Sequence, residues 1–202
     1  GGNDTYLAAA DATQSLTVKD DRYIDQNISW DQNFSSLNIG GTDVFITSKS
    51  IDADTGLDTN LTITYASSDT AVASIVSGDK LRIEGAGTAT ITASQSGNVA
   101  TGGRYNAATS VTKTVTIGKA SQSIVTSAGA TSLPDLTKDN GDFPFPPAVK
   151  SVDASGTDTG LTLSYSSSNT AVIDVNGINL EPKGVGTATI TVSQSGDTNY
   201  NA

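Results

Sequence analysis

The stretch that decides the fold is Leu61–Val72 (LTITYASSDTAV), because the chain repeats it as Leu161–Val172 (LTLSYSSSNTAV). A second stretch, Gly85–Gly97 (GAGTATITASQSG), returns as Gly184–Gly196 (GVGTATITVSQSG). The copies lie about 100 residues apart, which is the size of one independently folding domain and far too long for a solenoid repeat. The 202-residue chain is therefore predicted to hold two tandem modules.

A third match, of Ala12–Thr17 (ATQSLT) with Ala120–Val125 (ASQSIV), suggests the module boundaries. It gives an N-terminal segment at 1–11, module 1 at 12–119 and module 2 at 120–202. Under this match module 1 has eight more residues than module 2 before Leu61. Because loops absorb insertions more readily than strands, we expect the extra residues in the irregular stretch Tyr23–Gly41.

The residue pattern within each module has a period of two. Apolar side chains alternate with threonines in Thr88–Ala93 and again in Val111–Ile117, which is typical of strands with one buried face. No segment has a sustained apolar stripe of helical period. Short strands separated by turn residues predict an all-β chain of two tandem immunoglobulin-like β-sandwiches.

Three repeated elements resemble the bacterial Ig-like domains that occur in tandem in surface and secreted proteins. They are the Tyr-x-Ser-Ser-[Asp/Asn]-Thr-Ala-Val segment, the Gly-x-Gly-Thr-Ala-Thr-Ile-Thr strand and the Gln-Ser-Gly tail that ends in Tyr-Asn-Ala at 105–107 and 200–202. The resemblance implies an extracellular or cell-surface sandwich that serves as a spacer or adhesive element. From the residues alone, Tyr105 and Tyr200 are expected to bury their rings while each hydroxyl reaches a backbone group.

Composition argues against several functions. The net charge is −10 and is shared by both modules, so neither nucleic acid nor an anionic membrane is an expected partner. No apolar run is long enough to span a membrane. With no histidine and no cysteine, serine triads, thiol nucleophiles and the usual zinc sites are excluded, and we expect no enzyme activity and no catalytic residues.

Two features are candidate ligand sites. Asp52, Asp54 and Asp58 lie in a turn-rich segment, and closely spaced carboxylates suit calcium, although a solvated acidic loop is the commoner explanation. Calcium is the one cofactor that the sequence allows us to argue. The single tryptophan, Trp30, could stack on a sugar ring, or it could close an irregular loop over the core, which is the commoner arrangement.

Module 2 is expected to lack its own final strand, because nothing after Tyr200-Asn201-Ala202 corresponds to Val111–Ile117. The exposed edge would be the strand Thr187–Ser193, with Thr187, Thr189, Thr191 and Ser193 as acceptor-edge residues. Aligning Gln14 with Gln122 places residues 1–11 where a final strand of a preceding module would stand. Thr5, Leu7 and Ala9 are then the candidate donor-strand side chains.

These observations predict a non-catalytic structural protein of the cell exterior, a stalk or filament of Ig-like modules. Its expected partners are copies of itself, joined head to tail by strand insertion, or neighbouring modules of a longer array from which the chain is a window. The competing interpretation is a binding module. That module would be either a calcium-stiffened adhesin segment with a cell-surface partner, or a carbohydrate-binding accessory module that takes a surface glycan.

Overall fold

The computed structural model describes residues 23–126, 135–138, 141–145 and 149–202. The chain is all-β, as predicted, and among the described residues the only helical element is the single 3-10 turn η1 (Val99–Thr101). The strands of the N-terminal half (residues 23–118) are β1 (Gln26–Ser29), β2 (Leu37–Asn38), β3 (Val44–Phe45), β4 (Lys49–Asp52), β5 (Thr64–Ser67), β6 (Ala73–Val76), β7 (Lys80–Ile83), β8 (Gly87–Ser94) and β9 (Val111–Gly118). Those of the C-terminal half (residues 120–202) are β10 (Gln122–Val125), β11 (Phe143–Pro144), β12 (Lys150–Asp153), β13 (Ser164–Ser167), β14 (Ile173–Asn176), β15 (Asn179–Pro182) and β16 (Ile190–Ser193).

In the N-terminal half the strands form three sheets. The largest has the order β2-β9-β8-β5, a second has the order β3-β7-β6, and β1 pairs with β4. The predicted strands at 88–93 and 111–117 are confirmed as β8 and β9, which pair antiparallel from Gly87↔Ile117 to Ala93↔Val111. Their threonines face solvent while their apolar residues face the core, as expected from a period of two.

The pairings of the C-terminal half repeat those of the N-terminal half. Strands β10 and β12 pair as β1 and β4 do, β13 and β16 as β5 and β8, and β11, β15 and β14 as β3, β7 and β6. The register is also kept, since Gln122↔Asp153 corresponds to Gln26↔Asp52 and Ser167↔Ile190 to Ser67↔Ile91. The repeated sequences therefore adopt the same local structure.

The structure corrects the alignment of the first strands. Gln122 pairs with Asp153 in the C-terminal half, and the residue with the same pairing in the N-terminal half is Gln26 rather than Gln14. The buried serine of the paired strand, Ser50 in β4 or Ser151 in β12, follows this glutamine by 24 residues in the N-terminal half and by 29 in the C-terminal half. The C-terminal half therefore has five more residues in this interval. The prediction of eight extra residues in module 1 is thus wrong, and Tyr23–Gly41 contains β1 and β2. Residues 12–17 of that match lie outside the described residues.

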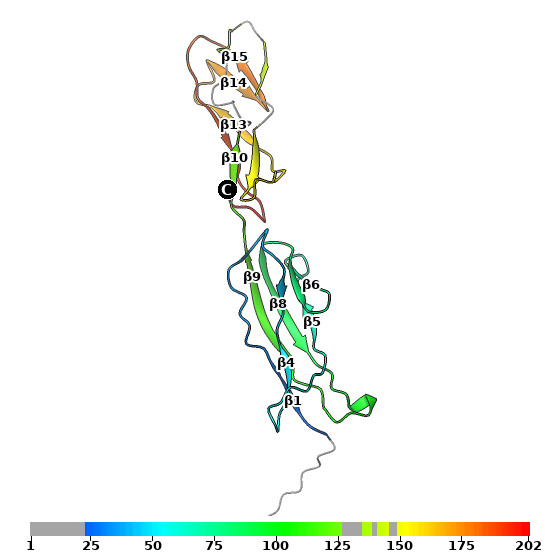
Figure 1. Cartoon of the computed structure of the whole chain (residues 1–202). Coiled ribbons are helices and arrows are strands. Elements are labelled where there is room, and N and C mark those ends of the chain that lie inside the picture. Colours follow the sequence, from blue (N-terminus) through cyan, green and yellow to red (C-terminus); the bar gives the residue numbers. More distant parts are fainter. Residues whose placement is uncertain (1–22, 127–134, 139–140, 146–148) are drawn as a thin grey trace, which may run out of the picture.

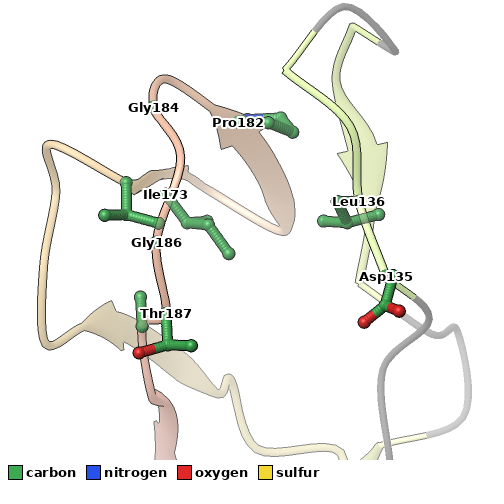
Figure 2. A pocket seen from close by; sticks show the side chains of 9 residues that line it. Asp135, Leu136, Ile173, Pro182, Gly184, Gly186 and Thr187 are labelled. Carbon is green, nitrogen blue, oxygen red and sulfur yellow. The ribbon is translucent and has the colours of Figure 1, made fainter.

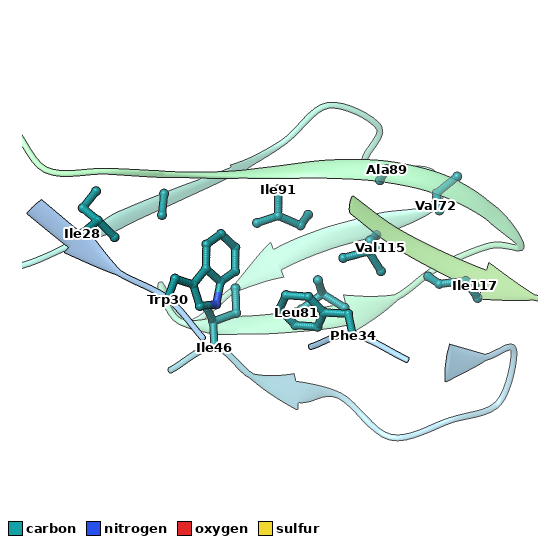
Figure 3. Close-up of a cluster of buried hydrophobic side chains, with 12 residues drawn as sticks. Ile28, Trp30, Phe34, Ile46, Val72, Leu81, Ala89, Ile91, Val115 and Ile117 are labelled. Carbon is teal, nitrogen blue, oxygen red and sulfur yellow. The ribbon is translucent and has the colours of Figure 1, made fainter. Parts of the chain in front are cut away.

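A single apolar cluster holds the sheets of the N-terminal half together (Figure 3). Ile91 and Val115 reach it from β8 and β9, and Leu81 reaches it from β7, all three with no exposed surface. Trp30 and Phe34 enter from the segment after β1 and meet edge to face, with ring centroids 5.7 Å apart. Burial of these side chains is the main contribution to the stability of this half.

A short junction joins the two halves (Figure 1). Strand β9 ends at Gly118 and β10 begins at Gln122, so three residues connect them. Ala120 forms an isolated parallel bridge with Tyr200, donating to the Asn199 carbonyl at 2.8 Å and accepting from the Asn201 amide at 2.9 Å. The Ala86 amide of the N-terminal half donates to Oδ1 of Asn199 at 3.0 Å, so the halves also meet through a side chain.

Within the described residues, none of the helical structure is long and apolar enough to cross a membrane.

Candidate functional site: the open edge of β16

The two copies of the Gly-Thr-Ala-Thr-Ile-Thr strand differ in their partners. In the N-terminal half β8 pairs with β5 on one edge and with β9 on the other. In the C-terminal half β16 pairs with β13 alone among the strands that the structure describes. The same sequence therefore has one occupied edge where its copy has two. An unpaired edge presents backbone N–H and C=O groups to any strand that fits them.

The missing neighbour also shortens the strand. Strand β8 begins at Gly87, and its first four residues pair with β9 but not with β5. Strand β16 begins only at Ile190, four residues later in the repeat, because no described strand stands where β9 would extend the ladder. Thr189 nevertheless keeps the hydrogen bond of its counterpart Thr90. The Thr189 amide donates to Oγ of Ser168 at 2.8 Å, as the Thr90 amide donates to Oγ of Ser68 at 2.9 Å.

Burial differs in the same way. In β8 the side chains of Ala89, Ile91 and Ala93 are fully or almost fully buried. Their counterparts Ala188, Ile190 and Val192 are all only half-buried. Strand β9 covers the first set with Val115 and Ile117, which are also buried. Among the described residues no equivalent strand covers the apolar face that continues into β16, so this face is partly exposed.

A cavity of about 320 Å³ opens at this uncovered face (Figure 2). Its lining includes Val172, Ile173, Gly186 and Ala188. In the N-terminal half the counterparts Val72 and Ala89 belong to the same buried cluster as Ile117 (Figure 3). The cavity thus lies where the C-terminal end of a β9-like strand would place an apolar side chain.

The predicted acceptor residues lie along this edge. Thr191 and Ser193 belong to β16, whereas Thr187 and Thr189 precede it, outside any assigned strand. All four side chains are exposed, so the residues that would pack an added strand against the core are the alternate ones, Ala188, Ile190 and Val192. The predicted donor residues Thr5, Leu7 and Ala9 lie outside the described residues.

The structure separates the three carboxylates predicted to bind calcium. Asp52 is buried, and its Oδ1 accepts the amides of Asp54 and Thr55 at 2.9 Å each. Asp54 is exposed. Asp58 accepts the Asn60 amide through Oδ1 and faces Nζ of Lys49 at 3.8 Å through Oδ2. Among the described residues, no group of three acidic side chains has the geometry to hold a metal ion.

The pKa of Asp52 is lowered from its ordinary value, chiefly by the hydrogen bond from the Thr55 amide, and burial opposes this only in part. Its Oδ2 accepts the hydroxyl of Tyr105 at 3.2 Å. Burial and this hydrogen bond raise the pKa of Tyr105. The prediction that the Tyr105 hydroxyl reaches a backbone group is therefore wrong, because a buried carboxylate takes that place.

Trp30 lies in the core with only 4% of its surface exposed. It packs edge to face against Phe34 and against Tyr65, whose ring centroid is 5.9 Å away. Of the two arrangements considered from the sequence, the structure shows the one in which the indole closes a loop over the core. In this conformation the ring presents no face on which a sugar could stack.

Sequence reasoning missed a buried polar network that occurs twice. Gln26 donates through Nε2 to Oε1 of Gln95 and to the Asn106 carbonyl, and it accepts the hydroxyl of Ser50. The equivalent groups of the C-terminal half, Gln122, Gln194, Asn201 and Ser151, make the same bonds. The available signal was the recurrence of Gln95 and Gln194 directly after the alternating strands β8 and β16.

No family model and no curated protein sequence matches the chain. Among solved structures, the chain is similar to the crystal structure of the S-layer protein rSbsC(31-844), with 14% sequence identity and a TM-score of 0.31. The alignment covers 89% of this chain and 28% of the S-layer chain, so the sequence spans little more than a quarter of that protein's length.

Proposed function

We propose that the chain is a non-catalytic structural element of an extracellular stalk or filament, made of two Ig-like β-sandwich modules. In this proposal the open edge of β16 accepts a strand from a second copy of the chain, and repetition of this contact joins copies head to tail. The observation that carries the proposal is the difference between β8, paired on both edges, and β16, paired on one edge among the strands that the structure describes.

The two halves support this function because they repeat one strand sequence but differ in the described strands that pair with it. Thr88–Thr92 and Thr187–Thr191 are identical in sequence. The sequence of the strand itself therefore does not explain why its apolar side chains are buried in one half and half-buried in the other. The edge of β8 is instead covered by a strand whose apolar side chains complete the core. In this proposal a strand from a second copy of the chain covers the edge of β16 in the same way.

An added strand would gain stability from two sources. Its backbone would satisfy the unpaired N–H and C=O groups of β16. Its apolar side chains would cover Ala188, Ile190 and Val192 and fill the adjoining cavity. Main-chain bonds confer affinity in strand addition, and alternate side chains confer specificity.

The acceptor edge can be tested with Ala188→Asp and its matched control Thr191→Asp. Ala188 lines the cavity, whereas Thr191 is exposed on the other face of the strand. We expect the unaltered chain and T191D to form linear assemblies by light scattering and negative-stain microscopy, and A188D to stay monomeric. Circular dichroism melting should show that A188D remains folded. A monomeric mass for the unaltered chain at high concentration would contradict the proposal.

A further inference from the structure

The structure fixes which strand pattern the β16 edge requires. Strand β9 supplies Val111, Val115 and Ile117 toward the core, and it turns Thr112, Thr114 and Thr116 outward. Its register on β8 is known residue by residue, from Gly87↔Ile117 to Ala93↔Val111. Because β16 repeats β8, a strand that completes it should repeat β9 in the corresponding register.

Once Gln26 is recognised as the counterpart of Gln122, the segment before β1 can be compared with β9 again. Residues 12–18 (ATQSLTV) match residues 111–117 (VTKTVTI). Ala12, Leu16 and Val18 stand at the three apolar core positions. The three outward threonine positions carry Thr13, Ser15 and Thr17, all with hydroxyls. The match thus keeps both faces of the strand.

A second feature fixes this alignment independently. Tyr6 precedes Ala12 by six residues, just as Tyr105 precedes Val111. Gly2 precedes Tyr6 by four residues, just as Gly196 precedes Tyr200. The tail pattern and the strand pattern therefore agree on one register, in which Leu7 stands at the position of Asn106 and not in the strand.

We infer that residues 12–18 of one copy form the strand that completes β16 of another copy, with Leu16 opposite Ala188 and Val18 opposite Gly186. This inference rests on the proposed function and names the donor that it requires. It replaces Thr5, Leu7 and Ala9 as the donor side chains. Val18 enters the cavity at Val172 and Ala188, as Ile117 packs with Val72 and Ala89.

The length of the chain requires the donor to come from a different copy. Residues 19–25 connect the donor to β1, and seven extended residues span at most about 25 Å. Strand β8 alone spans about 26 Å, and the start of β1 lies at the end of the N-terminal half that faces away from the C-terminal half (Figure 1). Residues 12–18 therefore cannot reach β16 of the same chain. Between copies the corresponding connection, from 19 to 26, is only three residues longer than Gly118 to Gln122.

The register can be tested by cross-linking, since the chain has no cysteine of its own. Thr88 and Thr116 stand opposite each other, with hydroxyl oxygens 3.5 Å apart. Their counterparts at the proposed contact are Thr187 and Thr17. A mixture of T17C and T187C chains should give a disulfide-linked heterodimer under mild oxidation, and T17C with T191C should not. Linkage in the second mixture alone would overturn the register.

Assembly of point variants of the full chain then separates the inference from the function. Leu16→Asp should weaken assembly at least about 100-fold, because it places a carboxylate in the apolar groove. Thr17→Asp, on the outward face, and Leu7→Asp should assemble like the unaltered chain. Assembly that resists L16D but is lost in L7D would overturn the inference while the head-to-tail function stands. An unaltered chain that neither assembles nor cross-links would overturn both.

Discussion

The hydroxyl of Tyr105 donates to the carboxylate of Asp52 at 3.2 Å, across 53 positions of sequence. The bond ties the segment after η1 to the end of β4. We predict that Tyr105→Phe lowers the melting temperature by a few degrees, because the buried Oδ2 of Asp52 loses its donor while the ring still packs. Thermal melting followed by circular dichroism measures this. An unchanged melting temperature would show that water replaces the hydroxyl at no cost.

The acid stability of the N-terminal half should depend on Asp52. In the folded state its pKa lies below the ordinary value of 3.8. Its contribution to the free energy of unfolding is therefore complete above pH 3.8 and is lost as the pH falls through the lowered pKa. Asp52→Asn should flatten the dependence of stability on pH below about 4. Urea unfolding at a series of pH values measures the slope, and a slope as steep in D52N as in the unaltered chain would contradict the assignment.

Tyr105 gives the opposite dependence at alkaline pH. Its folded pKa is raised above 10.0, so its contribution is complete below that value and is lost as the pH rises through the raised pKa.

The buried glutamine network should matter more in the N-terminal half. Gln26 is 3% exposed, whereas Gln122 is half-buried. Gln26→Ala removes one hydrogen bond each from the partner groups of Gln95, Ser50 and Asn106, and we expect a loss of about 2–4 kcal/mol in the free energy of unfolding. Gln122→Ala, with the same partners in a wetter setting, should lose less. Equal losses in urea titrations would argue against a role for burial.

Gly87 should not tolerate alanine. Its φ is +146°, and a Cβ there would stand 2.9 Å from Cγ2 of Val72. Gly87→Ala is expected to cost about 2–4 kcal/mol. The control is Gly56→Ala, where φ is +72° and no atom lies within 4 Å, so only the backbone conformation is strained, at about 1–2 kcal/mol. If both variants lose the same stability, the contact with Val72 contributes nothing.

Trp30 should report on the core. As the one tryptophan, it should emit at short wavelength in the folded chain, resist acrylamide quenching and shift to the red on unfolding. Trp30→Ala should cost about 3–5 kcal/mol, and Leu57→Ala, at a position 68% exposed, should cost under about 0.5 kcal/mol. Strong quenching in the folded state would contradict the packing against Phe34 and Tyr65.

Local patterns predicted the strands with alternating residues well, because β8 and β9 follow a period of two and bury one face each. The first strand was missed because its inward residues are Gln26 and Ile28. A glutamine there looks like a solvent-facing residue, and only the distant Gln95 and Asn106 make its burial favourable. A short match such as ATQSLT with ASQSIV was therefore free to give the wrong register.

The candidate site was predictable in outline and not in its contacts. Repetition alone predicted an exposed edge at Thr187–Ser193, and among the described strands β16 pairs with β13 alone. The carboxylate of Asp52 could not be placed by spacing, because its partners are backbone amides and a tyrosine far away in sequence. Which residues along this edge would pack an added strand against the core followed only from the half-burial of Ala188, Ile190 and Val192.

The parallel bridges at Ala120–Tyr200 and Ile24–Tyr105 bear on how the chain would carry tension. Each is closed by two backbone hydrogen bonds, in which the bridging residue donates to one carbonyl and accepts from one amide. When two parallel segments are pulled from opposite ends, both bonds are strained together instead of opening one after the other. A protein stretched along its length would therefore resist extension at the entrance to each half before any sheet unzipped.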